Sequence, residues 1–323
     1  MSVLSVSAQT AGVNKVTKTF HVASSGGWDY IAVGPDNDRI YLSHGNQVNI
    51  LNATTGDSVG IIPNTGGVHG IAFNKKMNKG YTSNGKLNTI TVFDLKTNAE
   101  LSQIPVGTNP DWILYEKFSN TIITCNGKSN DLTIVDAMTE KVISTIPVGG
   151  KPETAVSDNH GKLFVNIEDK NEIAVIDLKS NTVINHYPLD GESPTGLAID
   201  EKTHRLFAGC QQKLVILDAV SGKLVDTVEI GDGCDGVVFD HKTKRVFTSN
   251  GAAATMSVIQ EVSADKFTKL ADIPTKKGAR TIDVDTKTHT LYLPTADFLP
   301  LQAGQNRPSM VAGTFQVVVV KYE

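Results

Sequence analysis

Apolar residues in this chain occur in short runs, separated by turns rich in Gly, Asn, Asp and Lys. Short runs bounded by such turn residues are typical of β-strands, whereas helices need longer segments with a 3.6-residue repeat. In residues 66–84, for example, the strand-like "GIAF" leads through the polar turn "NKKMNK" into a second strand, "GYTSN". The pattern predicts an all-β protein.

The same pattern returns seven times at a spacing of about 40 residues. The copies begin GGWDYIAVGP, GGVHGIAFNK, GTNPDWILYE, GGKPETAVSD, GESPTGLAID, GDGCDGVVFD and KKGARTIDVD. A repeat of this length made only of short strands and turns is typical of propeller blades. We therefore predict one seven-bladed β-propeller domain of four-stranded antiparallel blades, spanning residues 15–323.

The two ends of the chain predict how the ring closes. After its second strand the seventh copy has a single strand left, "GTFQVVVVKYE", and it lacks a fourth. The N-terminal segment "NKVTKTFHVAS" resembles the fourth strands of the other copies. We expect the two segments to pair in one blade, which removes exposed sheet edges.

The third strand of most copies ends on an acidic or amide residue before a turn such as "LKTN" or "AVSG". Such a side chain accepts hydrogen bonds from the backbone two residues on, so we predict a structural role. The residues are Asn52, Asp94, Asp136, Asp177 and Asp218.

The segments "YTSNGKLNTITVFDLKTNAELSQIPVGTNP" and "VNIEDKNEIAVIDLKSN" resemble the YVTN-type repeats of bacterial and archaeal seven-bladed propellers. "YTSN" approximates the Tyr-Val-Thr-Asn strand end that names this family. The resemblance covers nearly the whole chain and implies a propeller. It leaves the activity open, because such propellers include surface proteins, binding proteins and propeller lactonases.

One position before the first strand of each copy forms a regular series. It is occupied by Asp29, His69, Asp111, Glu153, Thr195, Asp235 and Arg280, at spacings of 40, 42, 42, 42, 40 and 45. First strands line the central channel of a propeller, so we expect these seven side chains to form a ring at one mouth of the channel. We call them the mouth ring.

Four carboxylates brought together are costly in the absence of a partner, because like charges and desolvation both disfavour ionisation. A divalent metal ion is one remedy, and we predict its ligands among Asp29, His69, Asp111, Glu153 and Asp235. A small-molecule ligand held in the channel is another. The remaining alternative is a water-filled funnel in which Arg280 pairs with a neighbouring carboxylate.

Other features point to the same face. Trp28 and Trp112 flank members of the ring, and apolar rings beside a polar funnel suit a small organic ligand. Residues 296–313 form an insertion that is either a cover for the channel or a mobile surface loop. Blade geometry also brings the ends of the second strands to this face: His44, Asn84, Cys125, Asn126, Asn166, Cys210 and Asn250.

Composition and charge limit the classes of partner that this protein is expected to bind. The formal net charge of −4 and a pI near 6.1, with no long run of Lys or Arg, argue against nucleic-acid binding. No stretch approaches the ~18 uninterrupted apolar residues of a membrane span. Residues 4–9, "LSVSAQ", resemble the tail of a secretory signal, so we expect residues 1–14 to be a remnant or disordered tail and the protein to be periplasmic or extracellular.

Two functions remain open. The first is a monomeric binding protein that holds a small ligand or cation at the channel mouth, with protein or glycan partners on its loop faces. The second is an enzyme of the lactonase, hydrolase or lyase type, in which His69 or Glu153 acts as acid or base and Arg280 clamps an anion. A divalent metal would serve either function.

Overall fold

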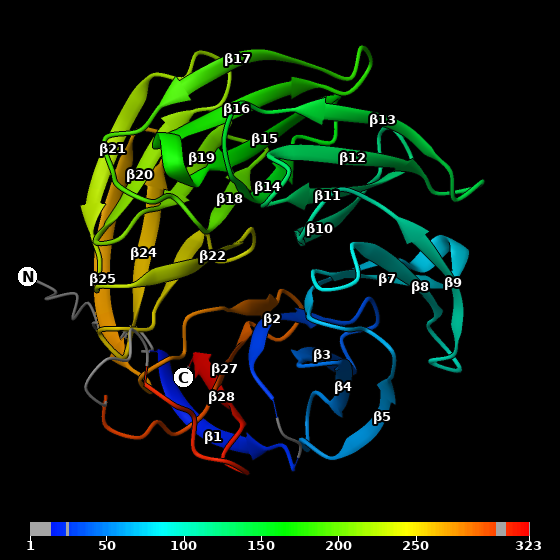
Figure 1. Ribbon diagram of the computed structural model, residues 1–323. Helices are drawn as coiled ribbons and strands as arrows, with labels where there is room; N and C mark the ends of the chain where they lie inside the picture. Colours follow the sequence, from blue (N-terminus) through cyan, green and yellow to red (C-terminus); the bar gives the residue numbers. More distant parts are fainter. Residues whose placement is uncertain (1–13, 24–25, 302–307, 323) are drawn as a thin grey trace, which may run out of the picture.

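The computed structural model describes residues 14–23, 26–301 and 308–322. Its strands form seven four-stranded antiparallel sheets arranged in a ring, which confirms the predicted all-β seven-bladed propeller (Figure 1). The suggested signal remnant lies outside the described residues, apart from Asn14. No helix in the described ranges has the length and apolar character needed to cross a membrane.

Each blade adds its strands from the channel outward. The innermost strands are β2 (Trp28–Val33), β6 (Val68–Asn74), β10 (Pro110–Glu116), β14 (Pro152–Ser157), β18 (Leu197–Asp200), β22 (Cys234–Asp240) and β26 (Asp283–Asp285). The second strands are β3 (Arg39–His44), β7 (Lys79–Asn84), β11 (Thr121–Asn126), β15 (Lys162–Ile167), β19 (Arg205–Gly209), β23 (Arg245–Asn250) and β27 (Thr290–Thr295).

The outer half of each blade completes the sheet. The third strands are β4 (Gln47–Asn52), β8 (Thr89–Asp94), β12 (Asp131–Asp136), β16 (Glu172–Asp177), β20 (Lys213–Asp218), β24 (Thr255–Ser263) and β28 (Gln316–Tyr322). The outermost strands are β5 (Ser58–Ile62), β9 (Glu100–Pro105), β13 (Val142–Pro147), β17 (Thr182–Pro188), β21 (Leu224–Glu229), β25 (Lys266–Pro274) and β1 (Asn14–His21). Two short 3-10 helices, η1 (Lys75–Met77) and η2 (Glu168–Lys170), lie in turns.

The seventh blade is built from both ends of the chain, as predicted. Strand β1 pairs antiparallel with β28, from Asn14 opposite Tyr322 to His21 opposite Gln316. Figure 1 shows the blue N-terminal strand beside the red C-terminal one. The outer edge of β28 is therefore covered by β1 and is not left unpaired.

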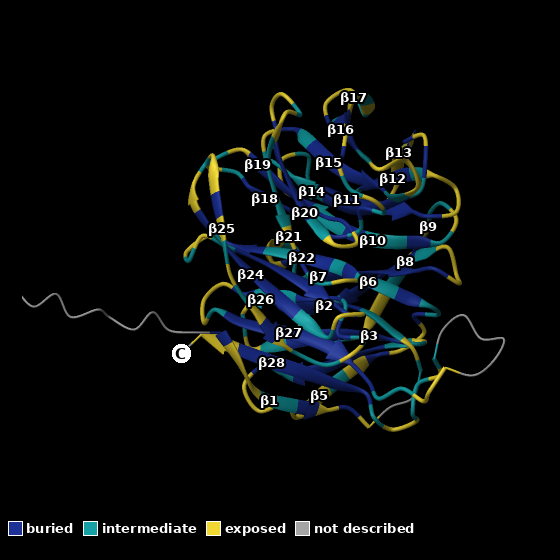
Figure 2. Ribbon diagram, turned by 90° about the vertical axis from the view of Figure 1, so that its left-hand side faces the viewer, coloured by how far each residue is buried: buried dark blue, intermediate teal, exposed yellow. Residues whose placement is uncertain are grey.

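The hydrophobic core lies between the blades. Each cluster of buried apolar residues joins one blade to the next, and Ile123 and Ile134 of the third blade, for example, pack against Val165 and Ile176 of the fourth. In Figure 2 the buried colour fills the strand centres, while exposed residues gather at turns and outer strands. The three cysteines are free and buried, each in a different cluster: Cys125, Cys210 and Cys234.

The turns after the third strands have the predicted capping. The Asp94 carboxylate accepts hydrogen bonds from the backbone N–H groups of Lys96 (2.9 Å) and Thr97 (2.8 Å). Equivalent contacts occur at Asn52, Asp136, Asp177 and Asp218. The turn then passes through a left-handed residue, Asn98 in the second blade (φ 60°) and Glu140 in the third (φ 58°), so these two positions are equivalent.

Closure of the ring is testable at Phe20, which is 4% exposed and packs between the seventh and first blades. We expect Phe20→Ala to lower the free energy of unfolding by about 3–5 kcal/mol, because it leaves a cavity at the closing interface. Denaturant unfolding measures this. Val16→Ala on the same strand, at a side chain 40% exposed, is the control, and we expect it to change stability by less than about 0.5 kcal/mol. Equal effects of the two substitutions would contradict a closing role.

Candidate functional site

The mouth ring lies where the innermost strands become irregular. In five blades the pairing of first and second strands shifts register at the ring residue: Asp29, His69, Asp111, Glu153 and Asp235. These five are the second residues of their strands. The prediction that they precede the strands is therefore wrong, because each strand begins two residues earlier than expected. Thr195 and Arg280 do precede β18 and β26. A β-bulge re-aims side chains, which explains why polar residues occur within otherwise apolar strands.

Hydroxyl groups of the second strands hold this irregular backbone. Ser43 Oγ accepts from the Asp29 N–H (2.9 Å) and donates to the Tyr30 carbonyl (3.1 Å). Ser83 Oγ accepts from the Gly70 N–H (2.8 Å) and donates to the Asp111 carbonyl of the next blade. These contacts satisfy backbone groups that the bulge removes from the ladder, and they position the ring.

Asp29, His69 and Asp111 form one group. His69 Nδ1 lies 2.6 Å from Asp29 Oδ2 and 3.7 Å from Asp111 Oδ1. One ligand atom from each of the three residues lies within 4.8 Å of the other two. The structure thus brings together three of the five predicted metal ligands.

Arg280 ties Asp29 to the sixth blade. Its guanidinium donates to Asp29 Oδ1 (2.9 Å), to the Trp28 carbonyl (3.2 Å) and to Asp235 Oδ2. Both arms are therefore engaged by carboxylates, as in the funnel alternative. An anion at Arg280 would have to displace one of them.

Glu153 belongs to a third group. Its Oε1 lies 2.6 Å from the Nζ of Lys151, which also contacts Glu168 Oε2. Sequence reasoning missed Lys151, although it stands two positions before a ring residue. Thr195, the neutral member, donates to the Cys234 carbonyl (2.9 Å) and joins blades instead of facing a ligand.

Burial and neighbouring charge shift the ring's ionisation. Burial, together with the Asp29 charge, raises the pKa of Asp111 to about 6. For Asp29 burial acts in the same sense, but Arg280 and His69 outweigh it and hold the pKa of that carboxyl below its usual value. Burial alone would lower the pKa of the His69 imidazole. The contacts of His69 with Asp29 and Asp111 outweigh burial and raise that pKa.

Beneath the ring, two aromatic side chains meet across the channel. The rings of Tyr30 and Trp112 pack edge to face with centroids 4.9 Å apart, although their blades are not neighbours. They line a cavity of about 110 Å³ together with Asp235 and Asp283. Tyr30 is 9% exposed.

The Tyr30 hydroxyl is close to the ring carboxylates. Burial raises its pKa well above the usual value, and the charges of Asp111 and Glu153 add to the rise. Sequence reasoning missed Tyr30. The available signal was its position one residue after the ring. Three other copies have glycine there, at which a Cβ atom would collide with the next blade: Gly70, Gly196 and Gly236.

The strand-end residues expected at the mouth prove to be structural. Asn84, for example, is fully buried, and its amide donates to Thr89 (3.1 Å) and Thr91 (2.8 Å) of its own blade. Asn126 and Asn250 donate to the equivalent positions of their own third strands. His44 is likewise buried, with its ring stacked on Phe315. These side chains are therefore removed from the site.

The described part of the 296–313 insertion packs beside the mouth. The ring of Phe298 lies 5.8 Å from that of Trp28. Backbone bonds from Leu299 to the Ser309 carbonyl and from Val311 to the Asp297 carbonyl, both 2.8 Å, join its two arms. Trp28 also packs on Phe315 at 5.5 Å, so this tryptophan anchors the insertion and does not line the cavity.

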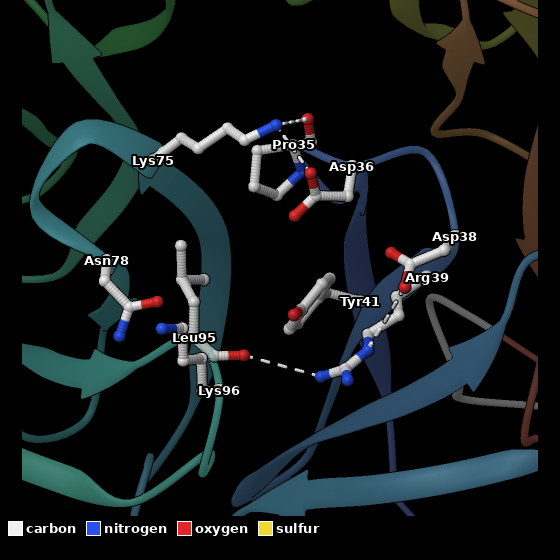
Figure 3. A pocket seen from close by; sticks show the side chains of 9 residues that line it. All are labelled: Pro35, Asp36, Asp38, Arg39, Tyr41, Lys75, Asn78, Leu95 and Lys96. Atoms are coloured by element: carbon white, nitrogen blue, oxygen red, sulfur yellow. Dashed lines mark hydrogen bonds and ion pairs between the residues drawn. The ribbon is translucent and has the colours of Figure 1, made fainter.

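A larger cavity, of about 390 Å³, lies on the opposite face between the first two blades (Figure 3). It is lined by the turn after β2, by η1 and by the turn after β8. No ring residue reaches it.

No protein-family model matches the chain, and no curated protein matches it. Solved structures do match the chain. The WD40 repeats of RRP9 are 9% identical with a TM-score of 0.80, over 97% of this chain and 99% of that one. U3-55K is also 9% identical, with a TM-score of 0.79 over 94% and 98%. Hydrazine synthase of Kuenenia stuttgartiensis is 15% identical, with a TM-score of 0.73 over 84% and 94%.

At such identities these similarities show the fold alone. The chain is thus a seven-bladed β-propeller protein. The comparisons do not identify the YVTN-type family within that class.

Glu153 provides a test of the ring's electrostatics. Burial, reinforced by Asp111, raises its pKa to about 9, although Lys151 opposes the shift. Because this value lies above the ordinary 4.5, ionisation destabilises the folded state, with no cost below the ordinary pKa and a growing cost as the pH rises toward 9. We expect Glu153→Gln to melt a few degrees higher than the parent at pH 8 and at about the same temperature near pH 5.

Thermal melting across this pH range measures the effect, and Lys151 keeps Glu168 as a partner in the variant. The exposed Glu100→Gln substitution is the control, with no expected pH-dependent difference. A variant that is less stable than the parent at pH 8 would show that the Lys151 ion pair outweighs burial.

Proposed function

We propose that this propeller is a binding protein whose channel mouth holds a divalent cation between Asp29, His69 and Asp111. The observation that carries the proposal is the convergence of one nitrogen and two oxygen ligands within 4.8 Å. Ligand atoms that share a metal ion at 2.0–2.2 Å lie roughly 3 Å apart. The distances from His69 Nδ1, 2.6 and 3.7 Å, bracket that separation.

The charge at the mouth favours a cation over an anion. Asp29, Asp111 and Asp235 supply three negative charges near neutral pH, and Arg280 offsets one of them. His69 offsets another only while it is protonated. Since Arg280 already contacts two carboxylates, an anion finds few free donors, whereas a metal ion would replace the proton between His69 and Asp29.

One oxygen of the group supports a ligand at this position. Asp111 Oδ1 is buried and has no hydrogen-bond partner among the described residues, a state that costs free energy. A metal ion held by the three side chains would satisfy it. The mixed imidazole and carboxylate donor set suits several metals.

Calorimetric titration with Zn²⁺ and, separately, with Mn²⁺ tests the proposal. We expect one site per chain. Asp111→Asn should weaken metal binding by more than about tenfold, because loss of a residue that only supports a metal ligand already weakens binding about tenfold or more. Affinity should fall as the pH drops through about 6, because protons then compete for Asp111 and His69.

The matched control is His186→Ala. His186 Nδ1 lies 2.8 Å from Glu172 Oε1 at the surface, and the described residues place no third ligand beside them, so the loss of His186 should leave the titration unchanged. Absence of binding for both metals, or equal binding by the Asp111→Asn variant, would refute the cation site and leave the hydrated funnel.

An enzyme remains the second candidate, and one observation favours it. Asp29 accepts a short hydrogen bond from His69, which is how a carboxylate orients an imidazole that acts as general base. This candidate predicts hydrolysis of a lactone or ester that His69→Ala slows about 100-fold. Screening short-chain lactones and esters, with Glu153→Gln and Arg280→Gln beside His69→Ala, tests the three proposed roles. Turnover unaffected by His69→Ala would place the chemistry elsewhere.

We further propose a YVTN-type propeller that works in the periplasm or outside the cell. The repeat strand end "YTSN" and the small residues of positions 4–9 support this. Expression of the whole gene followed by cell fractionation distinguishes this location from the cytoplasm.

A further inference from the structure

The cavity of about 390 Å³ between the first two blades has the size of a small-molecule site. Figure 3 shows Arg39 reaching across the gap toward the Leu95 carbonyl, with the Lys75–Asp36 pair on the other side. Pro35, Leu95 and the ring of Tyr41 supply apolar wall. Comparison with the equivalent gaps between other blades shows which side chain this gap lacks.

In two other blades a cation at the start of the second strand crosses to the next blade's outer turn and meets a carboxylate. Lys79 Nζ of the second blade lies 2.5 Å from Glu140 Oε1 of the third. Arg205 of the fifth blade contacts Asp265 of the sixth (2.9 Å) as well as its own Asp218 (2.7 Å). These ion pairs span the gaps between their blades.

Arg39 is the equivalent cation of the first blade, and the second blade offers it no carboxylate among the described residues. Among the described residues its guanidinium meets the Leu95 carbonyl at 3.4 Å, the Tyr41 hydroxyl and its exposed neighbour Asp38 at 3.8 Å. The position that Glu140 occupies in the third blade is Asn98 in the second. Arg39 is accordingly 32% exposed, against 11% for Arg205.

The charges around the cavity leave a positive excess. Lys75 and Asp36 pair with each other at 2.5 Å. The remaining lining charges are Arg39 and Lys96 against Asp38. An arginine with free donors binds a carboxylate in a two-pronged geometry that a neutral group does not reproduce.

We propose that this cavity binds a small organic carboxylate, with Arg39 holding the carboxylate in the place of the missing acidic side chain. Lys96 adds positive charge at the rim, and the ligand's apolar body contacts Tyr41, Leu95 and Pro35. The site is independent of the channel mouth, which opens on the other face.

Titration with benzoate, followed by ¹H–¹⁵N NMR and calorimetry, tests the proposal. We expect saturable shifts confined to the first two blades. Benzyl alcohol, which has the ring without the charge, should bind at least about tenfold more weakly. Equal binding of the two probes, or shifts spread over all blades, would overturn the assignment.

Two variants test the role of Arg39 in opposite ways. Arg39→Gln removes the donor, and Asn98→Glu installs the carboxylate that the third blade carries, at a left-handed position where Glu140 already occurs. Both should weaken benzoate binding about tenfold or more. Asn98→Glu keeps Arg39, so it decides the question even when Arg39→Gln is poorly folded.

Lys79→Gln, in the neighbouring gap where the cation already has Glu140 as a partner, is the matched control and should leave benzoate binding unchanged. Asp111→Asn should also leave it unchanged, which separates this site from the metal site. Benzoate binding that survives both Arg39→Gln and Asn98→Glu would overturn the proposal.

Discussion

The pairing of β1 with β28 is the contact on which the rest of the structure depends, because it turns a row of seven sheets into a closed ring. The first six blades each consist of four strands that are consecutive in sequence. Closure brings the seventh blade against the first, so that Arg280 reaches Asp29 and the Thr281 hydroxyl reaches the Asp29 carbonyl, 251 and 252 positions apart. Asp29 in turn holds His69. The candidate site is therefore completed by the same contact that completes the fold.

Repetition fixes positions in this protein, and divergence between the copies creates chemistry at them. The bulge recurs in five blades and its supporting hydroxyl at Ser43, Ser83 and Ser249, so these ring residues have equivalent positions on the channel wall. The residue at that position differs from copy to copy, while serine hydroxyls of the second strands contact the backbone around it. The same reasoning applies on the opposite face, where Glu140 closes one gap and Asn98 leaves the preceding gap open.

The spacing of the copies was enough to predict the blade number, the closing pair and the seven ring positions, because these depend on backbone periodicity. It was not enough to predict which side chains pair. Lys151 reaches Glu153 from outside the series, and Tyr30 crosses the channel to Trp112 over an intervening blade. Such contacts depend on side-chain rotamers and on the curvature of the ring, which a linear pattern does not contain. Strand-end residues such as Asn84 were assigned to the correct face, but their burial depended on hydroxyl partners in the third strand.

The three cysteines give the molecule native reporters of its mechanics. Cys125 lies in the interface between the third and fourth blades, Cys210 between the fourth and fifth, and Cys234 between the fifth and sixth. Burial raises the pKa of all three thiols, so none forms a reactive thiolate while its interface is closed. The rate at which a thiol reagent labels each cysteine therefore reports how often one particular blade interface opens. The wild-type protein thus allows the opening of three consecutive interfaces to be measured separately.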